Sequence, residues 1–415
     1  MNPSPDPSSS GTLSRRAFMA AAAGASVLAA MPAAAEDAPK PQEFKRKIKL
    51  GVVGCGGRGA WIANLFKQHG GYEMHAVADY FQDAADACGN ALGVDKARRF
   101  TGLTGYKKLI ESGIEAIAII DVPYFYAEQA KAAVEAGCHV YTAKPMAVDV
   151  PGCLAIEAAA REATKKERCF LVDYQLPTEP ANIEVADRIR QGALGPLAHI
   201  VSFGICGAWA DPAKGPTIEG RLRGEIWLSD IALGGDNIVS YDIHIIDGVT
   251  WVMGGKRPVA ATGRSRVCRP NPNGDRTDAG GVVFEYDDGV IWTHITQALN
   301  NNSDLATLTA SLYGQAATAH IGYGGKVFVK GGDEKKYYVG TIGSIYDQGA
   351  IRNIADFYRN ITEGHFENPI AQRAVDGTLT AILGREAAAR GTRLTMEALI
   401  KENKKLEVDL KGLKA

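Results

Sequence analysis

The stretch Lys49-Leu-Gly-Val-Val-Gly-Cys-Gly-Gly-Arg-Gly59 reads as a buried strand that runs directly into a glycine turn. The turn has the spacing Gly54-x-Gly56-x-x-Gly59, and a helical apolar pattern starts at Ala60. In such a turn the first glycine permits the sharp bend, the second lets the backbone approach a pyrophosphate, and the third lets helix and strand pack closely. The N-terminus of the helix adds free N–H groups and a positive dipole end. The stretch therefore predicts a dinucleotide-binding strand, turn and helix.

A second strand pattern, Glu73-Met-His-Ala-Val-Ala-Asp79, ends in an acid about 20 residues beyond the last glycine. A carboxylate at this place binds the ribose of a dinucleotide and repels the 2′-phosphate of NADP. Tyr80 follows the acid where an arginine would favour NADP. We therefore expect NAD as the cofactor, with NADP less favoured. The expected cofactor-binding residues of this region are Gly54, Gly56, Gly57, Arg58, Gly59 and Asp79.

The hydrophobic rhythm divides the rest of the chain into two parts. From Ile48 to about Tyr174 strand and helix patterns alternate, which is typical of a doubly wound parallel sheet. After about Ala193 strand patterns follow one another, at 198–204, 258–266, 281–286, 290–295 and 307–313. Residues 349–405 return to helical spacing. The sequence predicts an α/β Rossmann domain and then an α+β domain, whose open, mostly antiparallel sheet is covered by helices.

The N-terminus carries Ser14-Arg15-Arg16-Ala17-Phe18-Met19, a short alanine-rich apolar run and then Ala33-Ala34-Ala35. This pattern resembles a twin-arginine export signal and predicts a periplasmic or otherwise exported protein. The apolar run is too short to span a bilayer, so no membrane span is expected in the mature protein. The expected divisions are 1–35 signal peptide, 36–47 linker, 48–174 NAD(P)-binding Rossmann domain, 175–405 substrate-binding domain and 406–415 tail.

Composition excludes several kinds of protein. The net charge of the 415 residues is −1, which leaves no basic surface for nucleic acid. The seven cysteines are scattered without a CxxC pair, so we expect neither a metal site nor a disulfide framework. Outside the cytoplasm free NAD has no obvious supply. An exported enzyme of this kind is therefore expected to hold its cofactor tightly and to complete its redox cycle on the protein.

Two further motifs carry a family resemblance. Ala143-Lys144-Pro145 follows a strand pattern, and a histidine-containing helical pattern lies in the second half, within Gly234–Trp251. With the glycine turn, these motifs resemble the Gfo/Idh/MocA (glucose-fructose oxidoreductase/inositol dehydrogenase) superfamily, and the export signal resembles its exported members. The resemblance implies a bound NAD or NADP and a carbohydrate or polyol substrate. It also places Lys144 beside the nicotinamide, where its ammonium would stabilise a developing alkoxide; Ala143 replaces the family's glutamate.

The second motif supplies the other catalytic candidates. From about Asn237 it predicts one helix, with Ser240 and His244 on the same face. His244 is the expected general base, because an imidazole titrates near neutral pH. The resemblance implies a carboxylate four residues before this histidine, where the chain has Ser240. Tyr241 and Asp242 are the candidates to replace it, and the expected catalytic set is Lys144, His244 and Tyr241.

Smaller motifs leave alternatives open. In the family a turn of the type found at Ile120–Tyr126 lies against the nicotinamide ribose, so Pro123 is expected to line the cofactor. Trp209 and Trp227 flank the polar run Glu219–Glu225, and each could stack on a sugar ring or belong to the core.

Three functions compete on this evidence. The first is an NAD(P)-dependent oxidoreductase that transfers hydride between a tightly bound cofactor and a carbohydrate or polyol hydroxyl or carbonyl. The second is a redox-neutral NAD-dependent glycoside hydrolase, which oxidises, eliminates, hydrates and reduces again. The third is a sugar-binding protein without catalysis. The open sheet also leads us to expect a homo-oligomer, a dimer or tetramer, because an exposed sheet face would be a large apolar patch.

Overall fold

The computed structural model describes residues 44, 46–301, 303, 307–343 and 345–415. The expected signal peptide, 1–35, and most of the expected linker lie outside the described residues. Within the described part of the chain, no helix is long and apolar enough to cross a membrane.

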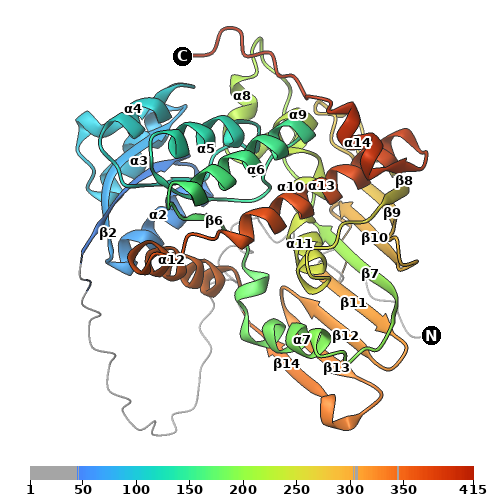
Figure 1. Cartoon of the computed structure of the whole chain (residues 1–415). Coiled ribbons are helices and arrows are strands. Elements are labelled where there is room, and N and C mark those ends of the chain that lie inside the picture. Colours follow the sequence, from blue (N-terminus) through green and yellow to red (C-terminus); the bar gives the residue numbers. More distant parts are fainter. Residues whose placement is uncertain (1–43, 45, 302, 304–306, 344) are drawn as a thin grey trace, which may run out of the picture. The chain divides into compact units, whose positions relative to one another are not determined.

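The first sheet has six strands in the order β3-β2-β1-β4-β5-β6, and every neighbouring pair is parallel (Figure 1). The strands are β1 (Ile48–Val53), β2 (Tyr72–Asp79), β3 (Arg99–Thr101), β4 (Ala116–Ile119), β5 (His139–Thr142) and β6 (Phe170–Val172). The helices between them are α2 (Gly57–His69), α3 (Gln82–Leu92), α4 (Gly105–Glu111), α5 (Tyr126–Glu135) and α6 (Val150–Lys165). All residues of β4 and β5 are buried, as in a parallel sheet covered on both faces. The predicted Rossmann domain is confirmed.

The second sheet has nine strands in the order β14-β13-β12-β11-β7-β10-β9-β8-β15. The strands are β7 (Leu197–Cys206), β8 (Ala260–Arg266), β9 (Ala279–Glu285), β10 (Ile291–Ala298), β11 (Thr307–Gly314), β12 (Thr318–Gly322), β13 (Gly325–Lys330), β14 (Tyr338–Ile342) and β15 (Leu394–Thr395). Only the central pair β7 and β10 is parallel, so the mostly antiparallel prediction is confirmed. Strands β12 to β15 were absent from the prediction.

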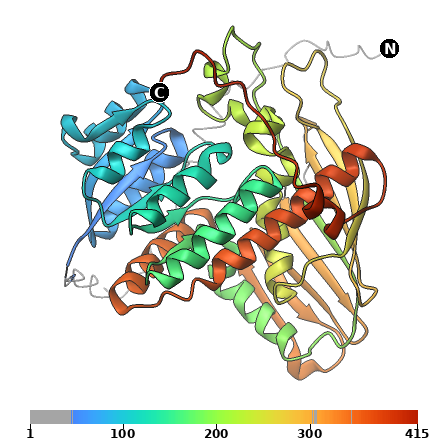
Figure 2. The ribbon, with the colours of Figure 1, turned by 45° about the horizontal axis from the view of Figure 1, so that its top comes forward.

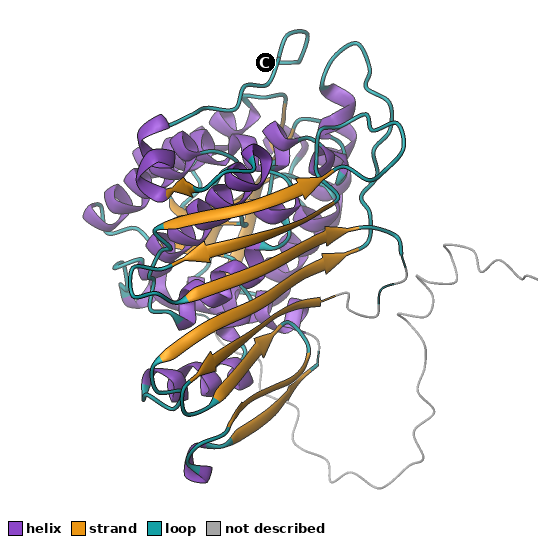
Figure 3. Cartoon of the chain, turned by 90° about the vertical axis from the view of Figure 1, so that its right-hand side faces the viewer, coloured by secondary structure: helices purple, strands orange, loops and turns teal. Residues whose placement is uncertain are grey.

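Helices lie on one face of this sheet, and the other face is open (Figure 3). The helices that contact its strands are α7 (Pro180–Arg190), α10 (Asn237–Ser240), α11 (Ile243–Val252), α13 (Pro369–Arg390) and α14 (Met396–Glu402). The short helices α8 (Glu219–Leu222) and α9 (Ile231–Gly234) lie in the connection between β7 and α10, and α12 (Ile345–Glu363) packs on α2. Burial alternates along β10, where Trp292 and His294 point into the core while Ile291 and Ile295 are exposed. The period of two follows from one covered and one open face.

The single helix predicted from Asn237 is wrong, because the chain breaks between α10 and α11. At the break Asp242 turns its side chain into the sheet, where Oδ2 lies 3.0 Å from His294 Nε2. Asn237 Nδ2 donates to Asp242 Oδ1 at 3.2 Å. Gly204 of β7 makes room, because a Cβ there would lie 2.0 Å from Asp242 Oδ1. The buried carboxylate therefore keeps its hydrogen bonds at the expense of helix continuity.

The C-terminal helices return to the Rossmann domain and complete its core. Phe357 of α12 meets the edges of the Phe66 and Tyr141 rings, at centroid distances of 6.4 and 5.6 Å. The Tyr72 hydroxyl donates to the Ile354 carbonyl at 2.8 Å. Figure 2 shows α13, in red, lying beside the green α6, and α12 packs on α2. The two domains are therefore interleaved along the chain.

Candidate active site

The glycine turn has the geometry that a pyrophosphate needs. Gly54 has φ +87°, in the left-handed region that favours glycine. A Cβ on Gly59 would lie 1.8 Å from the Gly54 carbonyl oxygen, so helix α2 could not approach β1 with any other residue there. At Gly56 and Gly57 a Cβ would meet only open space. The turn is thus tight on the protein side and open where the phosphates of a dinucleotide would lie.

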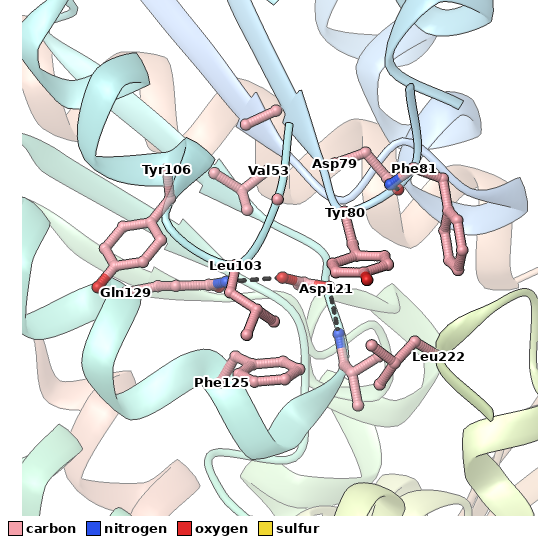
Figure 4. Close-up of a pocket in the computed structure, with 13 residues that line it drawn as sticks. Val53, Asp79, Tyr80, Phe81, Leu103, Tyr106, Asp121, Phe125, Gln129 and Leu222 are labelled. Carbon is pink, nitrogen blue, oxygen red and sulfur yellow. Dashed lines mark hydrogen bonds between the residues drawn. The ribbon is translucent and has the colours of Figure 1, made fainter. Parts of the chain in front are cut away.

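Asp79 stands at the end of β2, as predicted, and is tied to the turn. Its Oδ2 accepts from the Cys55 backbone N–H at 2.7 Å, and its Oδ1 accepts from the Phe81 N–H at 2.8 Å. A cavity opens beside it, with Asp121 and Gln129 on its opposite wall (Figure 4). The carboxylate is therefore held in a fixed orientation at the mouth of this cavity.

The cavity contains a buried polar atom without a partner. Gln129 Nε2 donates to Asp121 Oδ2 at 2.6 Å, whereas Gln129 Oε1 has no hydrogen-bond partner among the described residues. Burial raises the pKa of Asp121 to about 6. An unpaired acceptor in a cavity fits a ligand that brings an N–H donor, such as the amino group of adenine. Together with the open glycine turn, these residues fit a dinucleotide such as NAD.

Pro123 itself is buried at the start of a short turn, Pro123–Phe125. Its neighbours Asp121, Val122 and Phe125 line the cavity instead. In this segment, the residues on either side of the proline, rather than the proline itself, are therefore the ones placed to contact a cofactor.

Arg58 of the glycine turn reaches across to the end of β6. Its Nη2 donates to Asp173 Oδ2 at 2.6 Å, and the Asp173 side chain is fully buried. Asn353 of α12 donates to the other oxygen of Asp173 at 2.9 Å. Sequence reasoning missed Asp173, although its place just after a strand at the carboxyl edge of the sheet was a usable signal.

Lys144 follows β5 at the same edge of the sheet. Its Nζ donates to the Ser240 backbone carbonyl at 2.6 Å, which joins the Rossmann domain to α10. Burial, and then the positive charge of Arg58, lower the pKa of Lys144 to about 7. The lysine can therefore both donate to a reacting oxygen and exchange a proton near neutral pH.

His244 lies in the first turn of α11 and is buried. Its Nδ1 is 2.7 Å from the Tyr323 hydroxyl, which in turn is 3.4 Å from Gln175 Oε1. Gln175 Nε2 faces the Asp173 carbonyl at 3.4 Å, which orients the amide. If the Tyr323 hydroxyl donates to Gln175, the histidine carries its proton on Nδ1 and keeps the lone pair of Nε2 free. Burial, followed by the charges of Lys144 and Arg58, lowers the pKa of His244 well below its ordinary value. A neutral imidazole of this tautomer is a competent general base.

Tyr323→Phe should lower turnover roughly five- to tenfold, which is the effect of losing one hydrogen bond that selects a tautomer. We expect the change in kcat, with KM nearly unchanged, because Tyr323 acts through His244. The matched control is Tyr286→Phe, whose buried hydroxyl has no partner among the described residues. Equal kcat in Tyr323→Phe and the control would contradict the orienting role.

The candidates for the missing carboxylate separate in the structure. Asp242 points into the sheet and reaches His294, and the Ser240 hydroxyl turns back to the Asp236 carbonyl at 2.8 Å. Tyr241 stays beside His244, with ring centroids 6.5 Å apart, and its other side faces Trp209 at 6.1 Å. Tyr323, 79 residues further along the chain from His244, supplies the contact to the histidine. No local sequence signal marks that tyrosine.

The two tryptophans also differ. Trp209 Nε1 donates to Asn237 Oδ1 at 3.3 Å and borders the site through Tyr241. Trp227 packs against an apolar cluster around Leu222 and Leu233. Of the two tryptophans, only Trp209 therefore lies next to a candidate catalytic residue, Tyr241.

These features can be compared with known proteins. Residues 48–174 match the Gfo/Idh/MocA oxidoreductase family. The matching model describes the NAD-binding Rossmann fold of that family. The matched range covers the glycine turn, Asp79 and Lys144, and it ends just after Asp173.

Relatives extend the comparison at lower similarity. An uncharacterized oxidoreductase of Synechocystis sp., sll0816, is 27% identical over 226 residues, which cover 54% of this chain and 57% of that protein. A glycosyl hydrolase family 109 protein of Shewanella baltica is 28% identical over 206 residues, which cover 45% of this chain and 44% of that protein. The chain thus spans about half the length of these curated relatives.

A solved structure covers nearly the whole described fold. Levoglucosan dehydrogenase in complex with NADH superposes with a TM-score of 0.67 at 16% identity, over 85% of this chain and 99% of that one. This similarity confirms the two-domain fold.

Proposed function

We propose that the chain is an oxidoreductase that transfers hydride between a tightly held NAD and a hydroxyl or carbonyl group of a small carbohydrate or polyol. One observation carries the proposal: Lys144 donates to the carbonyl of Ser240, four residues before His244 in sequence, at the edge of an NAD-binding Rossmann sheet. The charge of Lys144 contributes to the lowered pKa of His244, which supports a proton donor and a proton acceptor near each other at the sheet edge where a nicotinamide is expected. The NADH complex of levoglucosan dehydrogenase and the inositol 2-dehydrogenase of Saccharopolyspora erythraea, 25% identical over 209 residues, support the substrate class.

In the proposed reaction, Lys144 and His244 act on the substrate, and Tyr323 and Arg58 act through them. Bound NAD supplies the hydride acceptor. Lys144 holds the reacting oxygen and stabilises the negative charge that develops on it. His244 Nε2 takes the hydroxyl proton, and Tyr323 keeps that nitrogen free to do so. Asp173 holds Arg58 in place, and the charge of Arg58 adds to the effect of burial in lowering the pKa values of Lys144 and His244.

The first test is to purify the protein without added cofactor, denature it and assay the supernatant for NAD and NADP. Near-stoichiometric NAD is the expected result. Protein that is empty and binds added NAD only weakly would overturn the proposal of a tightly held cofactor.

Asp79→Ser should weaken NAD binding about tenfold or more, which is the effect of losing a hydrogen bond to a charged group. It should also reduce the preference of the protein for NAD over NADP. Dissociation constants of both cofactors on stripped protein measure this. The control is Asp95→Ser, which changes an exposed acid outside the cavity. An unchanged ratio of the two constants would show that another group reads the ribose.

A second candidate function rests on the family 109 relative. In this alternative the enzyme oxidises a sugar carbon, eliminates the aglycone, adds water and reduces the carbon again. It predicts the release of an aglycone without a net change in NADH absorbance. Chromogenic glycosides, assayed at the aglycone and NADH wavelengths together, separate the two functions.

We also propose that residues 1–35 direct export by the twin-arginine route. Arg15, Arg16 and the small residues before Glu36 support this proposal. A fusion of the segment to a reporter that is active only after export tests it, with Arg15→Lys and Arg16→Lys together expected to abolish the signal. Reporter activity that survives both substitutions would contradict the route.

A further inference from the structure

The cavity beside Asp79 is lined by the Rossmann domain and by one residue from outside it. Its lining includes Val53 at the end of β1, Asp121 just after β4 and Gln129 of α5. Its outer wall includes Leu222 of α8, which belongs to the second domain (Figure 4). A ligand in this cavity would therefore be enclosed by both domains.

The segment 217–224 contacts the Rossmann domain on one side and its own domain on the other. Glu219 Oε1 accepts from the Tyr80 hydroxyl at 2.8 Å. Arg223 pairs with Asp83 at 2.8 Å, and its guanidinium lies 3.9 Å from the centre of the Phe81 ring. Arg221, between them, is buried and anchors the segment to its own domain through Asp230 and Asp211. The polar run singled out in the sequence is thus a docking element on the loop after β2.

The C-terminal residues 406–415 approach the same loop from the other side. They leave α14 and run back to the Rossmann domain, as the dark red segment in Figure 2 shows. Leu406, Val408 and Leu410 are half-buried, while Glu407 and Asp409 between them are exposed. The Leu406 N–H donates to Asp149 at 2.9 Å. The segment is therefore an extended strap with one side against the protein.

The two segments meet at Tyr80. The Lys414 N–H donates to the Tyr80 hydroxyl at 3.2 Å, and the Leu103 N–H donates to the Lys414 carbonyl at 3.0 Å. A Cβ on Gly412 would lie 3.1 Å from Thr217, so the strap also contacts the other segment directly. The apolar side chains at this junction form one cluster, to which Tyr80, Phe81, Leu222, Val408 and Leu413 belong.

We propose that residues 217–224 and 406–415 form a clasp that retains the cofactor by closing the adenosine end of its cavity. The inference rests on the proposed function, because it takes NAD as the ligand of the cavity. A ligand that is covered in this way leaves only when the clasp opens, so the clasp acts on the release rate more than on the association rate. The apolar cluster and the hydrogen bonds at Tyr80 hold it closed. A clasp of this kind would explain how the protein keeps its NAD while it completes a redox cycle without releasing the cofactor.

Leu413→Ser tests the clasp, with Lys411→Ser as the matched control. Leu413 belongs to the junction cluster, whereas Lys411 is exposed two residues away. The protein is loaded with NADH, and the loss of bound NADH fluorescence is followed after mixing with excess NAD. We expect release at least tenfold faster in Leu413→Ser and unchanged in Lys411→Ser. Tyr80→Phe, which removes the hydroxyl shared by both segments, should also accelerate release.

The outcomes separate the clasp from the function. Equal release rates in wild type, Leu413→Ser and Tyr80→Phe, each with bound NADH, would overturn the clasp and leave the oxidoreductase proposal intact. Wild-type protein that binds no NAD would overturn the proposed function itself. A chain that ends at Lys405 gives a second measurement, because it removes the whole strap; retention of cofactor by that folded chain through gel filtration would also overturn the clasp.

Discussion

Lys144→Met lowers turnover about 10²- to 10³-fold and leaves the bound NAD content unchanged; this is the result we expect first. The range is the effect of removing one donor from the oxygen on which charge develops. Methionine keeps the apolar part of the lysine side chain but lacks the Nζ that donates to the Ser240 carbonyl. The loss should appear in kcat for hydroxyl oxidation, measured as NADH formation in a single turnover.

The role of Lys144 also predicts how the oxidation rate changes with pH. The pKa of Lys144 is lowered to about 7, so the ammonium prevails below pH 7 and the amine above it. Because the ammonium is the donor in the proposed step, oxidation should slow as the pH rises through about 7. Lys144→Arg keeps its charge over this range and should lose that alkaline limb, at a lower overall rate.

The control for Lys144 is Lys326→Met, an exposed lysine on β13. Its turnover should equal that of the wild type. A Lys144→Met variant with wild-type turnover and wild-type cofactor content would remove the lysine from the mechanism.

His244→Asn should lower turnover about 10²- to 10⁴-fold, which is the usual contribution of a positioned general base. Asparagine can still donate to the Tyr323 hydroxyl, so the local packing around α11 is kept while the basic nitrogen is lost. Burial and the neighbouring cations hold the pKa of His244 well below its ordinary value, so the wild-type base stays neutral at pH 7. Activity should therefore show no acid limb near pH 6.5 from this residue.

His199→Asn is the control, because His199 is exposed on β7 and stacks on Tyr313. Thermal unfolding of both variants checks that neither loses the fold. A His244→Asn enzyme within twofold of the control would remove His244 from the mechanism.

The Rossmann half could be predicted closely because its signals are local. The strand into the glycine turn, and the acid at the end of β2, depend on residues that are near each other in sequence. Glycine at position 59 is required by a contact with position 54, only five residues away. Local pattern and tertiary structure agree in this half.

The second half was less predictable where distant partners decide the conformation. The break before α11 depends on Asp242 meeting His294, 52 residues away, and on the space left by Gly204. A helical pattern taken alone contains none of this. The contact between His244 and Tyr323 likewise depends on the β12–β13 hairpin, whose two strands were not predicted from the sequence.

The return of α12 to the Rossmann domain has a consequence for how the protein is made. A ribosome that has released residues 48–174 has produced every strand of the parallel sheet, but not Phe357, which packs on Phe66 and Tyr141. It has also not produced Asn353, which holds the Asp173 carboxylate that binds Arg58. The nascent sheet therefore displays an aromatic surface until translation has passed residue 361. We expect the dinucleotide site to be completed only near the end of synthesis, because the Asp173 carboxylate lacks its contact with Asn353 until then.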